Sequence, residues 1–141
     1  MPKYYNLDRF LTAQHIIYDR VVQELLIGKK SSHWMWFIFP QLKGLGKSEM
    51  AQQFAISDQE EARAYLAHDE LGPRIMDCTM LVCRHTDKSA ISIFGEIDAM
   101  KFHSSMTLFS LVDEPDGEFA EALAQFYNGE ADPATLSLLH S

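Results

Sequence analysis

Apolar residues recur three and four positions apart in the first part of this chain, and this spacing constrains the fold more than any other feature. Residues at such steps share one face of an α-helix, and that face has to be buried against other elements. The positions concerned are Leu7, Phe10, Leu11, Tyr18, Val21 and Leu25. The pattern predicts a helix over residues 6–26, with Gly28 as its stop.

Capping residues predict two further helices in the middle of the chain. Ser57 and Glu60 form a Ser-x-x-Glu pattern, in which two side chains bond the free amides of a helix start. This pattern predicts a helix over residues 58–68. Pro73 is compatible with a first helical turn, so another helix is expected from Pro73 to about residue 85.

The segment after Asp87 is expected to contain a short and a long helix. An apolar turn over residues 90–94 ends at Gly95. Residues 96–111 can then continue as one helix, for which we expect Ile97, Met100 and Leu108 to face inward.

The C-terminal segment shows the same helical spacing. A helix containing Phe119 is expected to end before Gly129, and Asp132 with Pro133 supplies a cap and a first-turn proline for a last helix through residue 139. The predicted fold class is therefore all-α, with about six to seven helices.

The run Trp34-Met35-Trp36-Phe37-Ile38-Phe39 departs from this pattern, because it is apolar without a period. So short a run fits a buried strand or a buried helix equally well. No other segment offers a comparable partner strand, and an isolated strand is not stable. We therefore predict a short buried helix.

The size and charge of the chain limit its organisation and its partners. With 141 residues, 47% of them hydrophobic, one domain over residues 1–141 is expected. A formal net charge of −8 disfavours binding to nucleic acid or to an anionic membrane surface. No signal peptide or membrane-spanning run is recognised, so we expect a cytoplasmic protein; its oligomeric state stays open.

The two cysteines, Cys78 and Cys83, fall in one predicted helix, where a spacing of five points them to different faces. A disulfide between them is therefore not expected. Buried free thiols are the favoured interpretation, and a reactive thiol is the alternative.

The segment after Pro40 imitates a phosphate-binding loop, because it ends Gly44-Leu45-Gly46-Lys47-Ser48 before a predicted helix. The true motif needs glycine where Gln41 stands, and it needs a parallel sheet, so a nucleoside triphosphatase is not predicted. Two interpretations remain: an ordinary loop with Ser48 as a helix cap, or an anion site made by backbone amides.

His33, Trp34 and Trp36 concentrate both tryptophans of the chain beside one histidine. The indoles are either core anchors or the wall of a pocket that stacks a base or sugar. His33 is a candidate proton donor or acceptor near neutral pH.

Asp98 and Lys101 are three residues apart on a predicted helix and so share a face. A surface ion pair is one explanation. The alternative is a polar pocket, with Asp98 as acid or base, Lys101 holding an anion, and the hydroxyls of Ser104, Ser105 and Thr107 in its wall. The six histidines show no ligand spacing, so no metal and no cofactor are predicted.

The segment Ser32-His33-Trp34-Met35-Trp36-Phe37-Ile38-Phe39-Pro40-Gln41, with Ile93-Phe94-Gly95-x-x-Asp98-x-x-Lys101, resembles the bacterial family named domain of unknown function 1810. The resemblance implies a small all-α protein and no established reaction. Some members carry the label calpastatin, but this chain lacks the proline- and lysine-rich composition of such an inhibitor.

A fainter likeness links Lys101-Phe102 and its helical surroundings to small N-glycosidases that act on ADP-ribose derivatives. Those proteins carry a tryptophan followed by Glu-His, which this chain lacks.

These observations lead to one hypothesis and one rival. The hypothesis is a pocket for a phosphate-bearing nucleotide or sugar, with Asp98 or His33 handling a proton and glycosidic bond hydrolysis as the first reaction to test. Its binding residues would be Trp34, Trp36, Gln41, Gly44, Gly46, Lys47, Ser48, Arg74, Lys101, Ser104, Ser105 and Thr107. The rival is a protein-interaction module whose acidic surface meets a basic partner.

Overall fold

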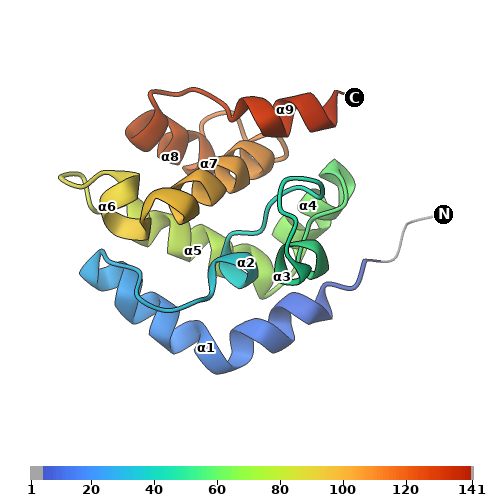
Figure 1. The fold of residues 1–141 in the computed structure, drawn as a ribbon, viewed down its shortest axis with the longest axis horizontal. Helices are drawn as coiled ribbons and strands as arrows, with labels where there is room; N and C mark the ends of the chain where they lie inside the picture. The colour runs from blue at the N-terminus through green and yellow to red at the C-terminus, as the bar shows by residue number, and fades with distance from the viewer. Residues whose placement is uncertain (1–4, 141) are drawn as a thin grey trace.

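The computed structural model describes residues 5–140, and this part of the chain forms nine α-helices and no strand beyond one isolated bridge (Figure 1). The helices are α1 Asp8–Ile27, α2 Met35–Ile38, α3 Glu49–Gln53, α4 Gln59–Ala67, α5 Leu71–Cys83, α6 Ala90–Phe94, α7 Glu96–Ser110, α8 Glu118–Tyr127 and α9 Pro133–Leu139. Three of them are single turns of four or five residues. The all-α fold and the expected number of longer helices are confirmed.

Local signals fix several helix ends as predicted. Gly28 stops α1 in the left-handed conformation at φ 85°, and its N–H donates to the Glu24 carbonyl. Pro73 lies in the first turn of α5. Asp132 caps α9 by accepting a hydrogen bond from the Thr135 N–H.

The start of α4 differs from the prediction by one residue. Asp58, and not Ser57, is the cap, because its carboxylate accepts a hydrogen bond from the Glu61 N–H at 2.8 Å. Glu61 in turn accepts from the Ser57 N–H at 2.7 Å. The reciprocal arrangement is the expected one, but a carboxylate replaces the hydroxyl.

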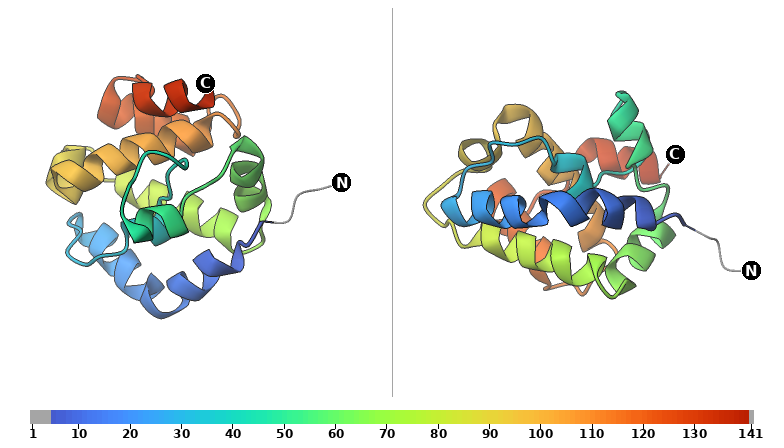
Figure 2. Two further views of the ribbon diagram at one scale, coloured as in Figure 1. Left: turned by 45° about the vertical axis from the view of Figure 1, so that its right-hand side comes forward. Right: turned by 90° about the horizontal axis from the view of Figure 1, so that it is seen from below.

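Helix α5 occupies the middle of the molecule and packs against α1, α4 and α8, whereas α7 packs mainly against α8 and also contacts α6, α4 and α9. The short helix α2 lies between α1 and α7 (Figures 1 and 2). The predicted short buried helix in the aromatic run is confirmed.

Aromatic side chains join α2 to the helices opposite it. The Phe39 ring meets the Phe102 ring edge-on at 5.0 Å between centroids, and Phe102 stacks on Phe94 at 4.8 Å. All three side chains are buried. This cluster fixes the end of α2 against the junction of α6 and α7.

The predicted orientation of Ile97 and Met100 is wrong. Both side chains face outward, and 73% and 72% of their surfaces are exposed, while Leu108 is buried as expected. Both residues lie on the side of α7 opposite Ala99 and Phe102, which are buried, so these turns face the core with those residues instead. None of the helices in residues 5–140 combines the length and the apolar character of a membrane span.

The thiols of Cys78 and Cys83 are free. Burial raises the pKa of Cys78 to about 12 and that of Cys83 to about 11. Both groups therefore stay protonated near neutral pH, and we expect the folded protein to react very slowly with a disulfide reagent such as Ellman's reagent. Unfolding in guanidinium chloride should release both thiols to rapid reaction, whereas rapid labelling of the folded protein would contradict the burial of these thiols.

Candidate functional site

The site is built on the loop between α1 and α2, and the Glu24 carboxylate organises this loop. Glu24 accepts hydrogen bonds from the Ser31 N–H at 2.7 Å, the Ser32 N–H at 3.0 Å and the Ser32 hydroxyl at 2.6 Å. It also accepts from the Trp34 indole N–H at 2.9 Å. Burial would raise the carboxyl pKa, but these bonds, led by that from the Ser32 hydroxyl, lower the pKa of Glu24 to about 2.

The first tryptophan of the run belongs to the core. Trp34 is buried, its ring lies 6.3 Å from that of Phe39, and its only polar atom is bonded to Glu24. Trp34 therefore anchors the loop and is not in the wall of the hollow described next. Of the two tryptophans, only Trp36 lines this hollow.

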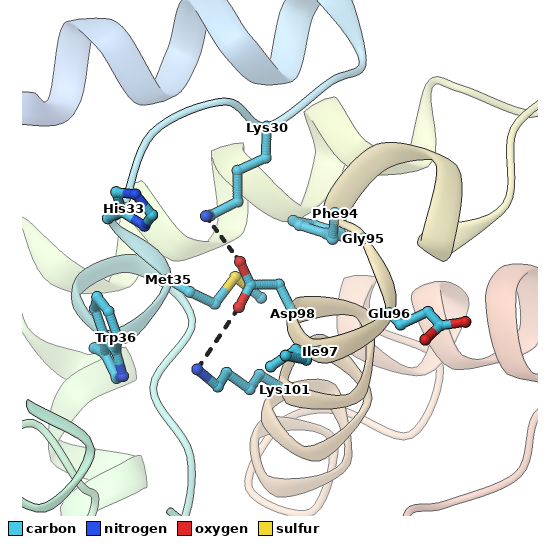
Figure 3. A pocket seen from close by; sticks show the side chains of 10 residues that line it. All are labelled: Lys30, His33, Met35, Trp36, Phe94, Gly95, Glu96, Ile97, Asp98 and Lys101. Carbon is cyan, nitrogen blue, oxygen red and sulfur yellow. Dashed lines mark ion pairs between the residues drawn. The ribbon is translucent and has the colours of Figure 1, made fainter. Parts of the chain in front are cut away.

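A hollow of about 500 Å³ lies between this loop and the start of α7 (Figure 3). It brings together Asp98, His33, Trp36 and Lys101, four of the residues singled out in the sequence, although they come from two distant segments. Its full lining is Lys30, His33, Met35, Trp36, Phe94, Gly95, Glu96, Ile97, Asp98 and Lys101.

Two lysines flank the Asp98 carboxylate in this hollow. The Lys30 Nζ lies 2.8 Å from one oxygen of Asp98, and the Lys101 Nζ lies 3.7 Å from the other. In Figure 3 the carboxylate sits between the two ammonium groups, and the Glu96 side chain points away from them. These three side chains are 8% (Lys30), 19% (Asp98) and 23% (Lys101) exposed, so the charges are partly shielded from water.

Lys30 is the residue that sequence reasoning missed. It lies in a turn beside a second lysine, a pattern that alone indicates only a solvated loop. Its backbone N–H donates to the Ile93 carbonyl at 2.8 Å, which ties the loop to α6.

Trp36 presents both a flat face and a polar edge. The Lys101 Nζ lies 4.9 Å from the centre of its ring, within the range of a cation–π contact. Its indole nitrogen is buried, and no residue of the described chain accepts its hydrogen. A buried donor that stays unpaired costs roughly 1–3 kcal/mol of folding free energy. A hydrogen-bond acceptor that reached this N–H would recover that free energy.

The N-terminus of α7 forms the remaining wall. Gly95 precedes the helix at φ 86° and has no side chain with which to cap it. Backbone amides in a first helical turn attract acceptors and negative charge. Glu96 and Asp98 in the same turn oppose that attraction in part.

The loop that contains Gly44 and Gly46, called the glycine loop from here on, lines a second hollow beside the first and does not line the first one. Gln41, Gly46 and Ser104 line it together with Lys101. Gly44 packs near Leu138, and Lys47 is exposed outside both hollows.

Ser48 acts as a helix cap. Its hydroxyl accepts a hydrogen bond from the Ala51 N–H at 3.1 Å at the start of α3. Of the two interpretations of the Gly-Lys-Ser sequence, the structure supports the capped loop.

Three other singled-out residues lie away from the hollow. Arg74 lines a shallow depression with residues of α1, and its guanidinium stacks 4.9 Å from the Tyr18 ring. Ser105 and Thr107 are buried within α7, where Thr107 bonds the His103 carbonyl and the Asp132 N–H. Thr107 lies on the opposite face of α7 from Asp98, whereas Ser105 shares the face of Asp98 and Lys101 but is buried further along the helix, outside the lining of the hollow.

The described residues contain no cluster of three or more side chains suited to hold a metal ion. The hollow itself is lined by two carboxylates, two ammonium groups, an imidazole and an indole.

Two comparisons with known proteins found a match. The profile of the family described as "Protein of unknown function (DUF1810)" matches residues 4–139. The crystal structure of the conserved hypothetical protein Rv1873 from Mycobacterium tuberculosis is similar over 97% of this chain and 98% of its own, with 47% identity and a TM-score of 0.94. No curated protein matches the chain.

Proposed function

This chain belongs to the DUF1810 family, whose members have no established function, and we propose that it binds a small phosphate-bearing nucleotide or sugar in the cytoplasm, in the hollow between Trp36 and the start of α7. The observation that carries this proposal is that the ammonium groups of Lys30 and Lys101 and the ring of Trp36 line one hollow. Both ammonium groups gain from a ligand that supplies negative charge, and the ring offers a flat apolar face.

The local balance of charge supports an anionic ligand. Two ammonium groups flank the Asp98 carboxylate, and the second carboxylate of the lining, the exposed Glu96, points away from them (Figure 3). Around Asp98 the positive groups therefore outnumber the negative one, although the whole chain carries a net charge of −8. A phosphate can bind the outer side of both lysines, and the partial burial of these groups strengthens the attraction.

Asp98 is the candidate for chemistry. In hydrolysis of a glycosidic bond, the bond from the anomeric carbon to its leaving group breaks, and the electron pair goes to the leaving group. A water oxygen bonds to that carbon, and the water proton passes to Asp98 and then to the leaving group. A carboxylate held by Lys30 beside a flat indole suits both proton transfer and the stabilisation of positive charge on the sugar. His33, exposed at the rim, is the second candidate for the proton.

Ligand binding is tested by thermal shift with ADP-ribose, AMP, ribose 5-phosphate and inorganic pyrophosphate. A ligand at about 100 times its Kd stabilises the folded state by about 2.7 kcal/mol, which should raise the Tm of a chain this size by several degrees. Lys30→Ala should remove the shift, whereas Lys29→Ala, which changes the exposed neighbour of Lys30 in the same loop, should preserve it. Equal shifts in both variants would contradict the proposed site.

The reaction is tested by proton NMR of ADP-ribose derivatives incubated with the protein, in which release of the free sugar marks hydrolysis. We expect Asp98→Asn to lower the rate by at least about 100-fold, a typical effect of losing a general acid or base, while the thermal shift persists. If the wild-type protein binds but releases no sugar, the function is binding and the hydrolase proposal fails.

The second candidate function is a protein-interaction module. The exposed side chains of Ile97 and Met100 favour it, because large apolar residues that share one face of a helix are a common mark of contact surfaces. If none of the phosphate compounds shifts the Tm, this candidate replaces the first.

A further inference from the structure

A second hollow, of about 380 Å³, lies beside the first, between the glycine loop and α7. Its lining is Gln41, Leu45, Gly46, Ile97, Met100, Lys101, His103, Ser104, Asp132 and Ala134. Ile97 and Lys101 belong to the walls of both hollows. A ligand anchored at Lys101 can therefore extend from one into the other.

Helix α7 gives this hollow both apolar and polar side chains. The apolar ones are Ile97 and Met100, which are among the most exposed apolar side chains of the described residues, and the polar ones are Lys101, His103 and Ser104. Methionine adapts its shape to a flat ring, and its sulfur makes favourable contacts with aromatic groups. Ile97 and Met100 thus offer a flat ring an apolar surface beside Lys101.

Gln41 is the polar group best placed to select a ligand here. Its backbone carbonyl accepts from the Ile56 N–H at 2.8 Å, which holds this part of the loop in place. The structure records no hydrogen bond for its side-chain amide among residues 5–140. That amide presents a donor and an acceptor side by side, the arrangement that matches the edge of a nucleobase.

The other polar side chains of this hollow are already engaged. The Ser104 hydroxyl donates to Asp132 at 3.0 Å, and Asp132 also accepts from Thr135. One ring nitrogen of His103 bonds the Glu130 carbonyl at 2.8 Å, and its ring stacks on a tyrosine. The Gln41 side-chain amide is thus the group that remains available to form hydrogen bonds with a ligand.

We infer that the second hollow binds the base of a nucleotide whose phosphate lies over Lys30 and Lys101. The base would rest on Ile97 and Met100, and the Gln41 amide would pair with its edge. This inference rests on the proposed function and narrows it from a nucleotide or sugar to a nucleotide. It also explains why two large apolar side chains remain exposed beside a charged site.

The test compares AMP with ribose 5-phosphate by isothermal titration calorimetry, because the two ligands share the sugar and phosphate and differ in the base. AMP should bind about tenfold tighter or better, and Gln41→Ala should remove roughly tenfold of that advantage without changing the Kd of ribose 5-phosphate. Met100→Ala, which removes the apolar side chain at an exposed position without adding a charge near Lys101, should weaken AMP alone. Gln23→Ala, an exposed change on α1, serves as the control.

The outcomes of this experiment distinguish a failure of the base site from a failure of the proposed phosphate site. If ribose 5-phosphate or pyrophosphate binds but the base adds no affinity, or if Gln41→Ala weakens both ligands equally, the base site is overturned and the phosphate site stands. If no phosphate compound binds to the wild-type protein, both proposals fail together.

Discussion

Replacing Gly72 with alanine is expected to destabilise the fold more than the same change at any other glycine of this chain. A Cβ at this position would overlap the Leu66 carbonyl oxygen at the end of α4. Because the contact is with backbone, neither helix can relieve it by rotating a side chain. We expect a loss of about 3 kcal/mol or more in the free energy of unfolding, with a fall in Tm on the order of 10 °C.

Urea denaturation measures this loss, and Gly129→Ala is the matched control. Gly129 has φ 76° and no atom within 4 Å of an added Cβ. The same substitution should therefore cost only the strain of a left-handed alanine, about 1 kcal/mol. Equal effects at the two positions would show that the close approach of α4 and α5 at Gly72 is not as tight as described.

Glu24→Gln is expected to have the second largest effect. The buried carboxylate accepts four hydrogen bonds from the loop that carries Lys30, and a neutral amide of the same shape cannot accept them all. The pKa of Glu24 falls from its ordinary value of 4.5 to about 2 in the folded protein. That difference corresponds to a stabilisation on the order of 3 kcal/mol near neutral pH, which the variant should lose.

The sign of the pH dependence provides a sharper test. Because the folded pKa is depressed, the charged Glu24 stabilises the fold above the ordinary pKa of 4.5, and this stability disappears as the pH falls toward 2. The difference in the free energy of unfolding between wild type and Glu24→Gln, measured by urea denaturation, should become steadily smaller as the pH falls over that range. Asp19→Asn, at an exposed carboxylate of the same helix, is the control and should show no such gap. A constant gap for Glu24→Gln would contradict the charge-based account.

Much of the fold follows from the sequence, because helix spacing and caps are local signals. The stop at Gly28 and the start at Pro133 depend on residues within one turn of the boundary. The outward orientation of Ile97 could not be predicted in this way. This part of α7 carries apolar residues on two sides, and periodicity does not reveal which side the neighbouring helices cover.

The site was less accessible to prediction, because it depends on contacts between distant parts of the chain. Asp98 and Lys101 could be paired from their spacing on one helix, whereas the partner at 2.8 Å, Lys30, comes from a loop far away in the sequence. The different roles of Trp34 and Trp36 could not be predicted for the same reason, because they depend on contacts with distant residues. Only the folded chain shows that the Trp34 indole meets Glu24 and the Trp36 indole does not.

The most direct test of the ligand site uses the two tryptophans, whose indole N–H groups give separate signals in a proton–nitrogen NMR spectrum. The Trp36 indole lines the hollow with no protein acceptor, whereas the Trp34 indole is sealed in the core on Glu24. Titration with ADP-ribose or AMP should shift the Trp36 signal progressively to saturation and leave the Trp34 signal almost unmoved. If the Trp36 signal stays in place at saturating concentrations of both compounds, the hollow is not a nucleotide site.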